Sequence, residues 1–122
     1  MKTPSCLPLV TVCLLLVGAS SASSQLYQSL TFNVGLAQAV SRDLGSSGVT
    51  VNLRNDANEA LNLVWIDQQG TPQPMFAIPA RTEMPITTTP GHVFRIERQS
   101  GVIAANFQAS AALVQNYRVD LS

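Results

Sequence analysis

"VTVNLRNDANEALNLVWID", residues 49–67, holds two runs in which apolar and polar side chains alternate. Alternation with a period of two places every second side chain on the same face, which is typical of a strand with one buried face. That face would carry Val49, Val51 and Leu53 in the first run and Leu61, Leu63 and Trp65 in the second. Between the runs, "NDANEA" predicts a turn, because Asn and Asp side chains hydrogen-bond their own backbone. The stretch therefore predicts two half-buried strands joined by a short polar connection.

Further short runs with the composition of strands lie on both sides of this stretch. They are "LTFNVGL" (30–36), "MPITTT" (84–89), "HVFRIER" (92–98), "VIAANF" (102–107) and "YRVDLS" (117–122). "QQGTPQP" (68–74) is expected to end the strand that precedes it, because proline cannot donate a backbone hydrogen bond. Seven or eight short strands with turn residues between them predict an all-β, antiparallel sandwich or barrel.

The first residues have the pattern of a secretory signal peptide. Lys2 supplies a positive charge, an apolar run extends from Leu7 to Val17, and small residues follow up to a cleavage position after Ala22. The apolar run is shorter than the roughly 20 residues that a membrane-spanning helix needs. We therefore expect a signal peptide at 1–22, a secreted protein, and no membrane attachment after cleavage.

The rest of the chain is expected to have two parts. Residues 23–48 form an N-terminal lead segment, in which "GLAQAVSRDLG" (35–45) suggests a short helix ended by its final glycine. The pattern leaves open whether residues 26–40 add a strand to the sandwich or pack outside it as a helix. The flexible "GSSG" then marks a boundary, and residues 49–122 form the sandwich domain.

Composition narrows the classes of function. Both cysteines, Cys6 and Cys13, fall in the expected signal peptide, so the mature chain would have neither a thiol nor a disulfide. The mature chain would also have no lysine, and its six arginines against seven carboxylates give a net charge of −1. Binding to nucleic acid requires a basic patch, so nucleic acid is not an expected partner. A domain of this size without disulfides depends on packing and hydrogen bonding.

Catalytic and metal sites are not expected. The mature chain would contain one histidine and neither cysteine nor lysine, so a Cys–His pair and a lysine nucleophile are excluded. No serine lies in a nucleophile-elbow context. The carboxylates have no spacing that favours a glycosidase pair. A zinc site needs three or four ligands, mostly nitrogen or sulfur, and "DANE" (56–59) is more typical of a polar turn than of a calcium loop. We therefore expect no enzyme, no cofactor and no metal.

The only histidine, His92, would project from the same strand face as Phe94. If the strand that carries Trp65 lies nearby, an imidazole and two aromatic rings would form an apolar cup with one polar group. Such a cup suits a sugar face or a proline ring. The alternative is that Trp65 and Phe94 are ordinary core residues and that His92 is a hydrogen-bonded corner residue.

"VWIDQQGTPQPMFAIPARTEMPITTTPGHVFRI" (64–96) resembles the β domain of the von Hippel–Lindau tumour suppressor family. The shared residues, in order and without a gap, are Trp65, Gly70, Pro72, Gln73, Pro74, Pro79, Gly91, His92 and an aromatic residue, here Phe94. The resemblance extends over residues 49–122 and is weaker in the last third. It implies a prealbumin-like antiparallel β-sandwich that captures a hydroxylated proline in an extended peptide, the α subunit of hypoxia-inducible factor.

The resemblance also implies a set of ligand-binding residues, which are Trp65, Met75, Thr88, His92 and Phe94. Trp65 and His92 keep the residue types of the family, and Thr88 keeps a hydroxyl where the family has serine. Met75 replaces a tyrosine and Phe94 replaces a tryptophan, so a phenol and an indole N–H are missing. His92 and Thr88 could still hydrogen-bond a 4-hydroxyl group, whereas each lost buried polar contact costs about 1–3 kcal/mol.

The expected function is that of a secreted, non-catalytic module that binds an extended peptide or a matrix protein, with proline or hydroxyproline in the pocket. The family's tumour suppressor recruits a ubiquitin-ligase adaptor through a helical α domain. The sequence to Ser122 leaves no room for such a domain, so no such adaptor is an expected partner. Two alternatives remain open. One is a structural or assembly role through exposed strand edges, and the other is carbohydrate binding by the same aromatic face. A hydrolase ranks last.

Overall fold

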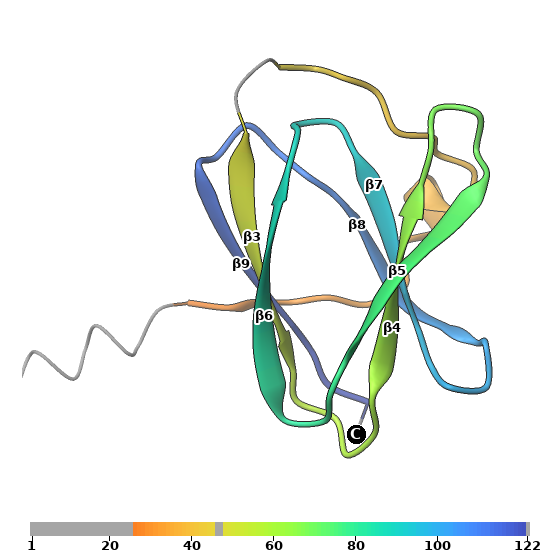
Figure 1. Cartoon of the computed structure of the whole chain (residues 1–122), viewed down its shortest axis with the longest axis vertical. Coiled ribbons are helices and arrows are strands. Elements are labelled where there is room, and N and C mark those ends of the chain that lie inside the picture. The colour runs from red at the N-terminus through yellow and green to blue at the C-terminus, as the bar shows by residue number, and fades with distance from the viewer. Residues whose placement is uncertain (1–25, 46–47, 122) are drawn as a thin grey trace, which may run out of the picture.

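Residues 26–45 and 48–121 are described by the structure, a computed structural model, and the expected signal peptide at 1–22 lies outside this part of the chain. Within it, eight strands form two four-stranded sheets that pack face to face (Figure 1), which confirms the predicted all-β sandwich. Across the same residues, no helix is long and apolar enough to cross a lipid bilayer.

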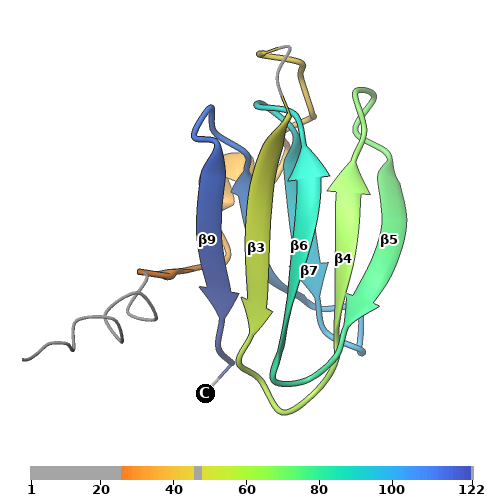
Figure 2. The same cartoon turned by 60° about the vertical axis from the view of Figure 1, so that its left-hand side comes forward.

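The two sheets differ in the directions of their strands. The first has the order β2-β9-β3-β6, with strands β2 (Gln28–Ser29), β9 (Val114–Val119), β3 (Val49–Asn55) and β6 (Thr82–Thr88). The second has the order β5-β4-β7-β8, with strands β5 (Pro72–Ile78), β4 (Leu61–Ile66), β7 (Val93–Glu97) and β8 (Ile103–Gln108). The second sheet is antiparallel throughout, whereas in the first β9 runs parallel to both β3 and β2 (Figure 2). β9 arrives from β8 in the opposite sheet and not through a hairpin, so no hairpin forces it to be antiparallel.

The core lies between the sheets and uses the alternating side chains that the sequence predicted. In β3, every second residue is buried, starting at Val49, and β4 buries Leu61 and Leu63. The large apolar side chains of this core with almost no exposed surface are Val51, Leu53, Leu61, Leu63, Ile78, Phe94 and Ile96. Each such side chain contributes about 1.5–3 kcal/mol when it leaves water, so this layer is the main source of stability.

The proline-containing segment at 68–74 was expected to end the preceding strand, and β4 does end at Ile66, but the two prolines do not stay outside the sheet. Pro72 and Pro74 lie inside strand β5, at the edge of the second sheet. An edge strand tolerates proline, because one side of its backbone has no partner strand. The register between β4 and β5 also skips one residue, so Met75 has no partner across the ladder. Such a bulge changes the direction of the strand and of the extra side chain.

The lead segment forms neither of the elements expected at 30–36 and 35–45. It contains only the two-residue β2 and a single 3-10 turn, η1 (Val34–Leu36). Asn33 holds this turn, because its side chain accepts a hydrogen bond from Gly35 N–H at 2.8 Å and its own N–H donates to Asn106 Oδ1 at 2.7 Å. Val34 is 77% exposed, so no continuous apolar stripe is buried that could stabilise a helix.

Instead, the lead segment passes from one sheet to the other (Figure 1). Near its start, the Tyr27 hydroxyl donates to Glu83 at 2.6 Å, and the guanidinium of Arg54 lies 4.4 Å from the centre of the Tyr27 ring. Near its end, Ala39 packs against a small apolar cluster that includes Val64. The segment is therefore attached to both sheets and fixes the residues that follow Ala39.

The connection between β3 and β4 is held by hydrogen bonds of one buried side-chain amide, that of Asn55. Asn55 is 1% exposed, and its Nδ2 donates to the carbonyl oxygens of Glu59 and Ile78, both at 2.9 Å. Its Oδ1 accepts from Ala57 N–H at 2.9 Å. All of this bonding is internal, as a buried polar side chain requires. Asn55 therefore ties the polar turn to the end of β5.

Candidate functional site

The structure brings the five residues implied by the resemblance together in one hollow of about 270 Å³. They come from separate elements: Trp65 from β4, Met75 from β5, Thr88 from β6, Phe94 from β7, and His92 from the turn before β7. Most of the hollow's exposed surface is apolar. An apolar concavity with a few polar groups is the usual form of a small-ligand site in proteins.

Strand register places the two aromatic walls side by side. Trp65 is the partner of Phe94 across the antiparallel β4–β7 ladder, so both side chains project from the same face of the sheet. Phe94 is only 2% exposed, and its ring stacks on that of Phe107 at 5.2 Å between centres. Trp65 is half-buried. Phe94 is therefore both a core residue and the floor of the hollow, and Trp65 forms a wall.

A tight turn places His92 at the same hollow. The N–H of His92 donates to the carbonyl oxygen of Thr89 at 3.2 Å, with Pro90 and Gly91 between them, and Gly91 has a φ of +96°. Proline followed by a residue of positive φ is the pattern of a type II turn, which favours glycine at its third position. The His92 ring then stacks on Trp65, with 5.5 Å between centres and 27° between planes.

Asp43 is the functional candidate that sequence reasoning missed. Its Oδ1 lies 2.7 Å from Nε2 of His92, while its own side chain is 66% exposed and that of His92 is 16% exposed. A carboxylate at this position selects the tautomer in which Nε2 carries the proton. Nδ1 is then the ring nitrogen left to accept a hydrogen bond from a ligand.

Backbone contacts of the lead segment hold Asp43 in place. Arg42 N–H donates to the carbonyl oxygen of Gly91 at 3.1 Å, and Leu44 N–H donates to that of Pro90 at 2.9 Å. The buried Ser41 hydroxyl donates to the Ile66 carbonyl oxygen and accepts from Val93 N–H at 2.8 Å. No local pattern around residue 43 signals these contacts, because they all depend on segments more than 20 residues away in sequence.

Three consecutive threonines are among the residues that line the hollow. Thr87 and Thr89 contribute to the lining alongside Thr88, and neither neighbour was among the predicted residues. The run of three threonines was the signal that could have found them. Among the described residues, no hydrogen bond joins any of these three hydroxyls to the His92 ring. The threonines are therefore free to bond a ligand but are not activated as nucleophiles.

The indole of Trp65 adds an unusual polar group. Its Nε1 is buried and has no hydrogen-bond partner among the described residues. A buried donor without an acceptor costs about 1–3 kcal/mol, and such groups in native proteins call for an explanation. The site thus combines flat apolar walls, one ring acceptor and several hydroxyls. Within the described residues, no group of three or more potential metal ligands is present.

The chain matches no protein-family model, and it matches no curated protein sequence.

Proposed function

We propose that this protein is a secreted, non-catalytic binding module that takes up a proline or hydroxyproline side chain of an extended peptide. The supporting observation is the convergence of Trp65, Met75, Thr88, His92 and Phe94, from five separate elements, on one apolar hollow. The resemblance to the von Hippel–Lindau β domain supplies the ligand class, and it is itself part of this proposal. Membership of that family would explain why these five side chains share one hollow.

The shape and chemistry of the hollow suit a proline ring. Phe94 and Trp65 offer apolar ring surfaces, and Met75 adds a flexible apolar group at the rim, where it is 46% exposed. A proline ring is rigid, so its binding loses little conformational entropy. Its neighbours in an extended peptide would lie along the edges of β5 and β6, which are the outermost strands of their sheets.

Preference for a 4-hydroxyl group would come from two side chains. Thr88 can donate or accept a hydrogen bond, and Nδ1 of His92 can accept one while Asp43 occupies Nε2. Two such bonds, at about 0.5–1.5 kcal/mol each, correspond to roughly a five- to hundredfold preference over unmodified proline. The buried Trp65 N–H can add to this preference only if the indole ring rotates when the peptide binds.

The decisive experiment is a titration of the protein with two short peptides that differ only in one 4-hydroxyl group. Trp65 is the sole tryptophan in the chain, so its fluorescence reports directly on the hollow. We expect saturable binding that favours the hydroxylated peptide and a loss of that preference in His92→Ala. Val102→Ala, in an exposed residue of the β7–β8 connection, is the matched control. Absence of binding to either peptide would refute the proposal, and equal binding would refute its hydroxyproline part.

An assembly role, through self-association or contact with another secreted protein, is the second candidate, and exposed apolar side chains favour its self-association form. Leu113 is 71% exposed and Val114 is 60% exposed at the start of β9. A concentration-dependent increase in mass by light scattering, abolished in Leu113→Ser, would support this role over peptide capture. A glycan array tests the remaining alternative, in which the Trp65 face binds a sugar.

A further inference from the structure

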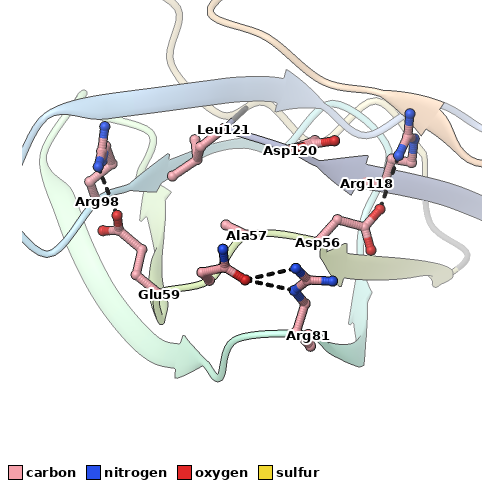
Figure 3. A pocket seen from close by; sticks show the side chains of 9 residues that line it. Asp56, Ala57, Glu59, Arg81, Arg98, Arg118, Asp120 and Leu121 are labelled. Carbon is pink, nitrogen blue, oxygen red and sulfur yellow. Dashed lines mark hydrogen bonds and ion pairs between the residues drawn. The ribbon is translucent and has the colours of Figure 1, made fainter.

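A second hollow, of about 490 Å³, lies at the opposite end of the sandwich from the Trp65 site. β6 connects the two, because it starts next to Arg81 and ends at Thr88. Three guanidinium groups line this hollow: Arg81 from the β5–β6 connection, Arg98 after β7, and Arg118 in β9 (Figure 3). The proposed peptide-binding function uses none of them.

Two of these arginines are paired with carboxylates. Arg98 Nη2 lies 2.8 Å from Glu59 Oε1, and Arg118 Nη1 lies 3.1 Å from Asp56 Oδ2 (Figure 3). Asp56 also bonds Arg54, so two guanidinium groups share one carboxylate. The positive charges on this side of the hollow are thus held in place by ion pairs that do not need a ligand.

Arg81 is bonded differently. Its Nε and Nη2 both donate to the side-chain oxygen of Asn58, at 3.0 and 2.7 Å. Asn58 is neutral, so it orients the guanidinium without cancelling its charge. A guanidinium has five N–H donors in a rigid plane, and these two bonds leave the others available.

The backbone at Arg81 is also exceptional. Its φ is +59°, and Arg81 is the only residue other than glycine with a positive φ in the described part of the chain. A side chain with a Cβ is disfavoured there, and glycine would be the unstrained choice. Strained backbone of this kind concentrates at functional sites, where the orientation of the side chain compensates for it.

We propose that this hollow binds a small monovalent carboxylate, with Arg81 as the binding residue and Asn58 as its positioning residue. A planar carboxylate matches the fork of donors on a guanidinium. Ala57 and Leu121 in the lining provide apolar contact for a short hydrocarbon group. The carboxylates Asp56, Glu59 and Asp120 around the hollow disfavour polyanions, so one negative charge is the best fit.

Propionate is a suitable probe, and binding can be followed through the NMR signals of the arginine Nε–H groups. We expect a saturable shift of the Arg81 signal with sodium propionate in the millimolar range. Sodium chloride at the same ionic strength and neutral propionamide should leave it unchanged. Equal shifts with chloride would show general screening of charge and overturn the proposal.

Three variants complete the test. Arg81→Gly should abolish propionate binding. Because this variant has no Arg81 signal, its titration is followed at the backbone amides of Asn58 and Thr82. Its Tm should stay equal or rise, because the backbone strain is relieved. Arg81→Lys keeps the charge but not the fork, and should weaken binding about tenfold or more. Arg42→Lys, in an exposed residue beside the other site, should bind as the parent protein does. Undiminished propionate binding in Arg81→Gly would overturn the proposal whatever happens to peptide binding.

Discussion

Asp43 and His92 are 49 residues apart in the sequence, yet Oδ1 of Asp43 and Nε2 of His92 are separated by only 2.7 Å. The lead segment therefore supplies a contact to the ring that stacks on Trp65 in the candidate pocket. One nitrogen of the imidazole is engaged before any ligand arrives. The hydrogen-bonding role left to His92 is consequently set by a residue outside the sandwich strands, in the lead segment.

Replacing Asp43 by Asn tests this control of the imidazole. The amide can still accept a hydrogen bond, but it no longer provides the negative charge that favours a proton on Nε2. We expect the preference for a hydroxylated peptide to fall about two- to fivefold, a modest change because the carboxylate is largely exposed. Ring nitrogen NMR shifts should show more of the Nδ1-protonated tautomer. An unchanged tautomer ratio would mean that Asp43 does not set it.

Thr88→Val removes one hydroxyl at nearly constant shape. β-Branching is kept, so β6 should form as before and Tm should change little. We expect affinity for the hydroxylated peptide to fall about three- to tenfold, with no loss for the unmodified one. Calorimetric titration of both peptides measures this difference. Equal losses for the two peptides would point to altered packing and not to a missing hydrogen bond.

Gly91→Ala is expected to be strongly destabilising, and Gly101→Ala is its matched control. Both glycines have a φ near +90°, which costs a residue with a Cβ about 1–2 kcal/mol. A Cβ at Gly91 would also overlap the carbonyl oxygen of Arg42 and approach Leu44 Cγ within 2.7 Å, whereas one at Gly101 meets nothing within 4 Å. Gly91→Ala should therefore lower the free energy of unfolding by at least about 1 kcal/mol more than the control does. Urea denaturation gives both values, and similar losses would contradict the close approach of the lead segment.

Acid should destabilise the protein through specific carboxylates. Desolvation raises the pKa of Asp56, but hydrogen bonds from Arg54 and Arg118 outweigh it and hold the pKa below its usual range. A hydrogen bond from Arg98 lowers the pKa of Glu59, with the backbone of Gln99 adding to the effect.

In both groups the folded pKa is lower than the unfolded one, so the stabilisation is present above the unfolded pKa and disappears as pH falls through the folded pKa. Tm should thus be nearly constant from about pH 7 to 5 and decline below about pH 4. Asp56→Asn should flatten this decline in a calorimetric series. A Tm that stays level down to about pH 2 would show that these ion pairs contribute nothing.

Much of the sandwich could be read from local pattern. The alternation in β3 predicted which side chains are buried, because a strand places every second residue on the same face. In β4 it predicted the burial of Leu61 and Leu63 but not that of Val64 and Ile66 on the opposite face. The prediction correctly ended β4 before the prolines but missed β5, whose edge position tolerates Pro72 and Pro74. It also failed in the lead segment, where Val34 and Leu44 suggested regular elements but remain exposed. In both places the deciding factor was the position of the segment in the sheet, which local pattern does not encode.

In the candidate pocket, too, some features could be predicted from the sequence and others could not. The prediction of Trp65, Met75, Thr88, His92 and Phe94 came from an ordered motif, and strand register brings them to one hollow. Asp43 could not be predicted, since its role depends on where the lead segment crosses the Pro90-Gly91 turn. The bulge that leaves Met75 without a partner was likewise invisible in the sequence.

The sequence by itself determined the class of fold, the core-facing side of β3 and β4 and the chemical types available for binding. These properties follow from the alternation of side chains and from composition, which act over a few neighbouring residues. Only the tertiary structure decided which groups meet: the Asp43 carboxylate at His92, and Asn58 at the strained Arg81. Such meetings depend on sheet order and on long-range hydrogen bonds, which form only when distant segments pack together.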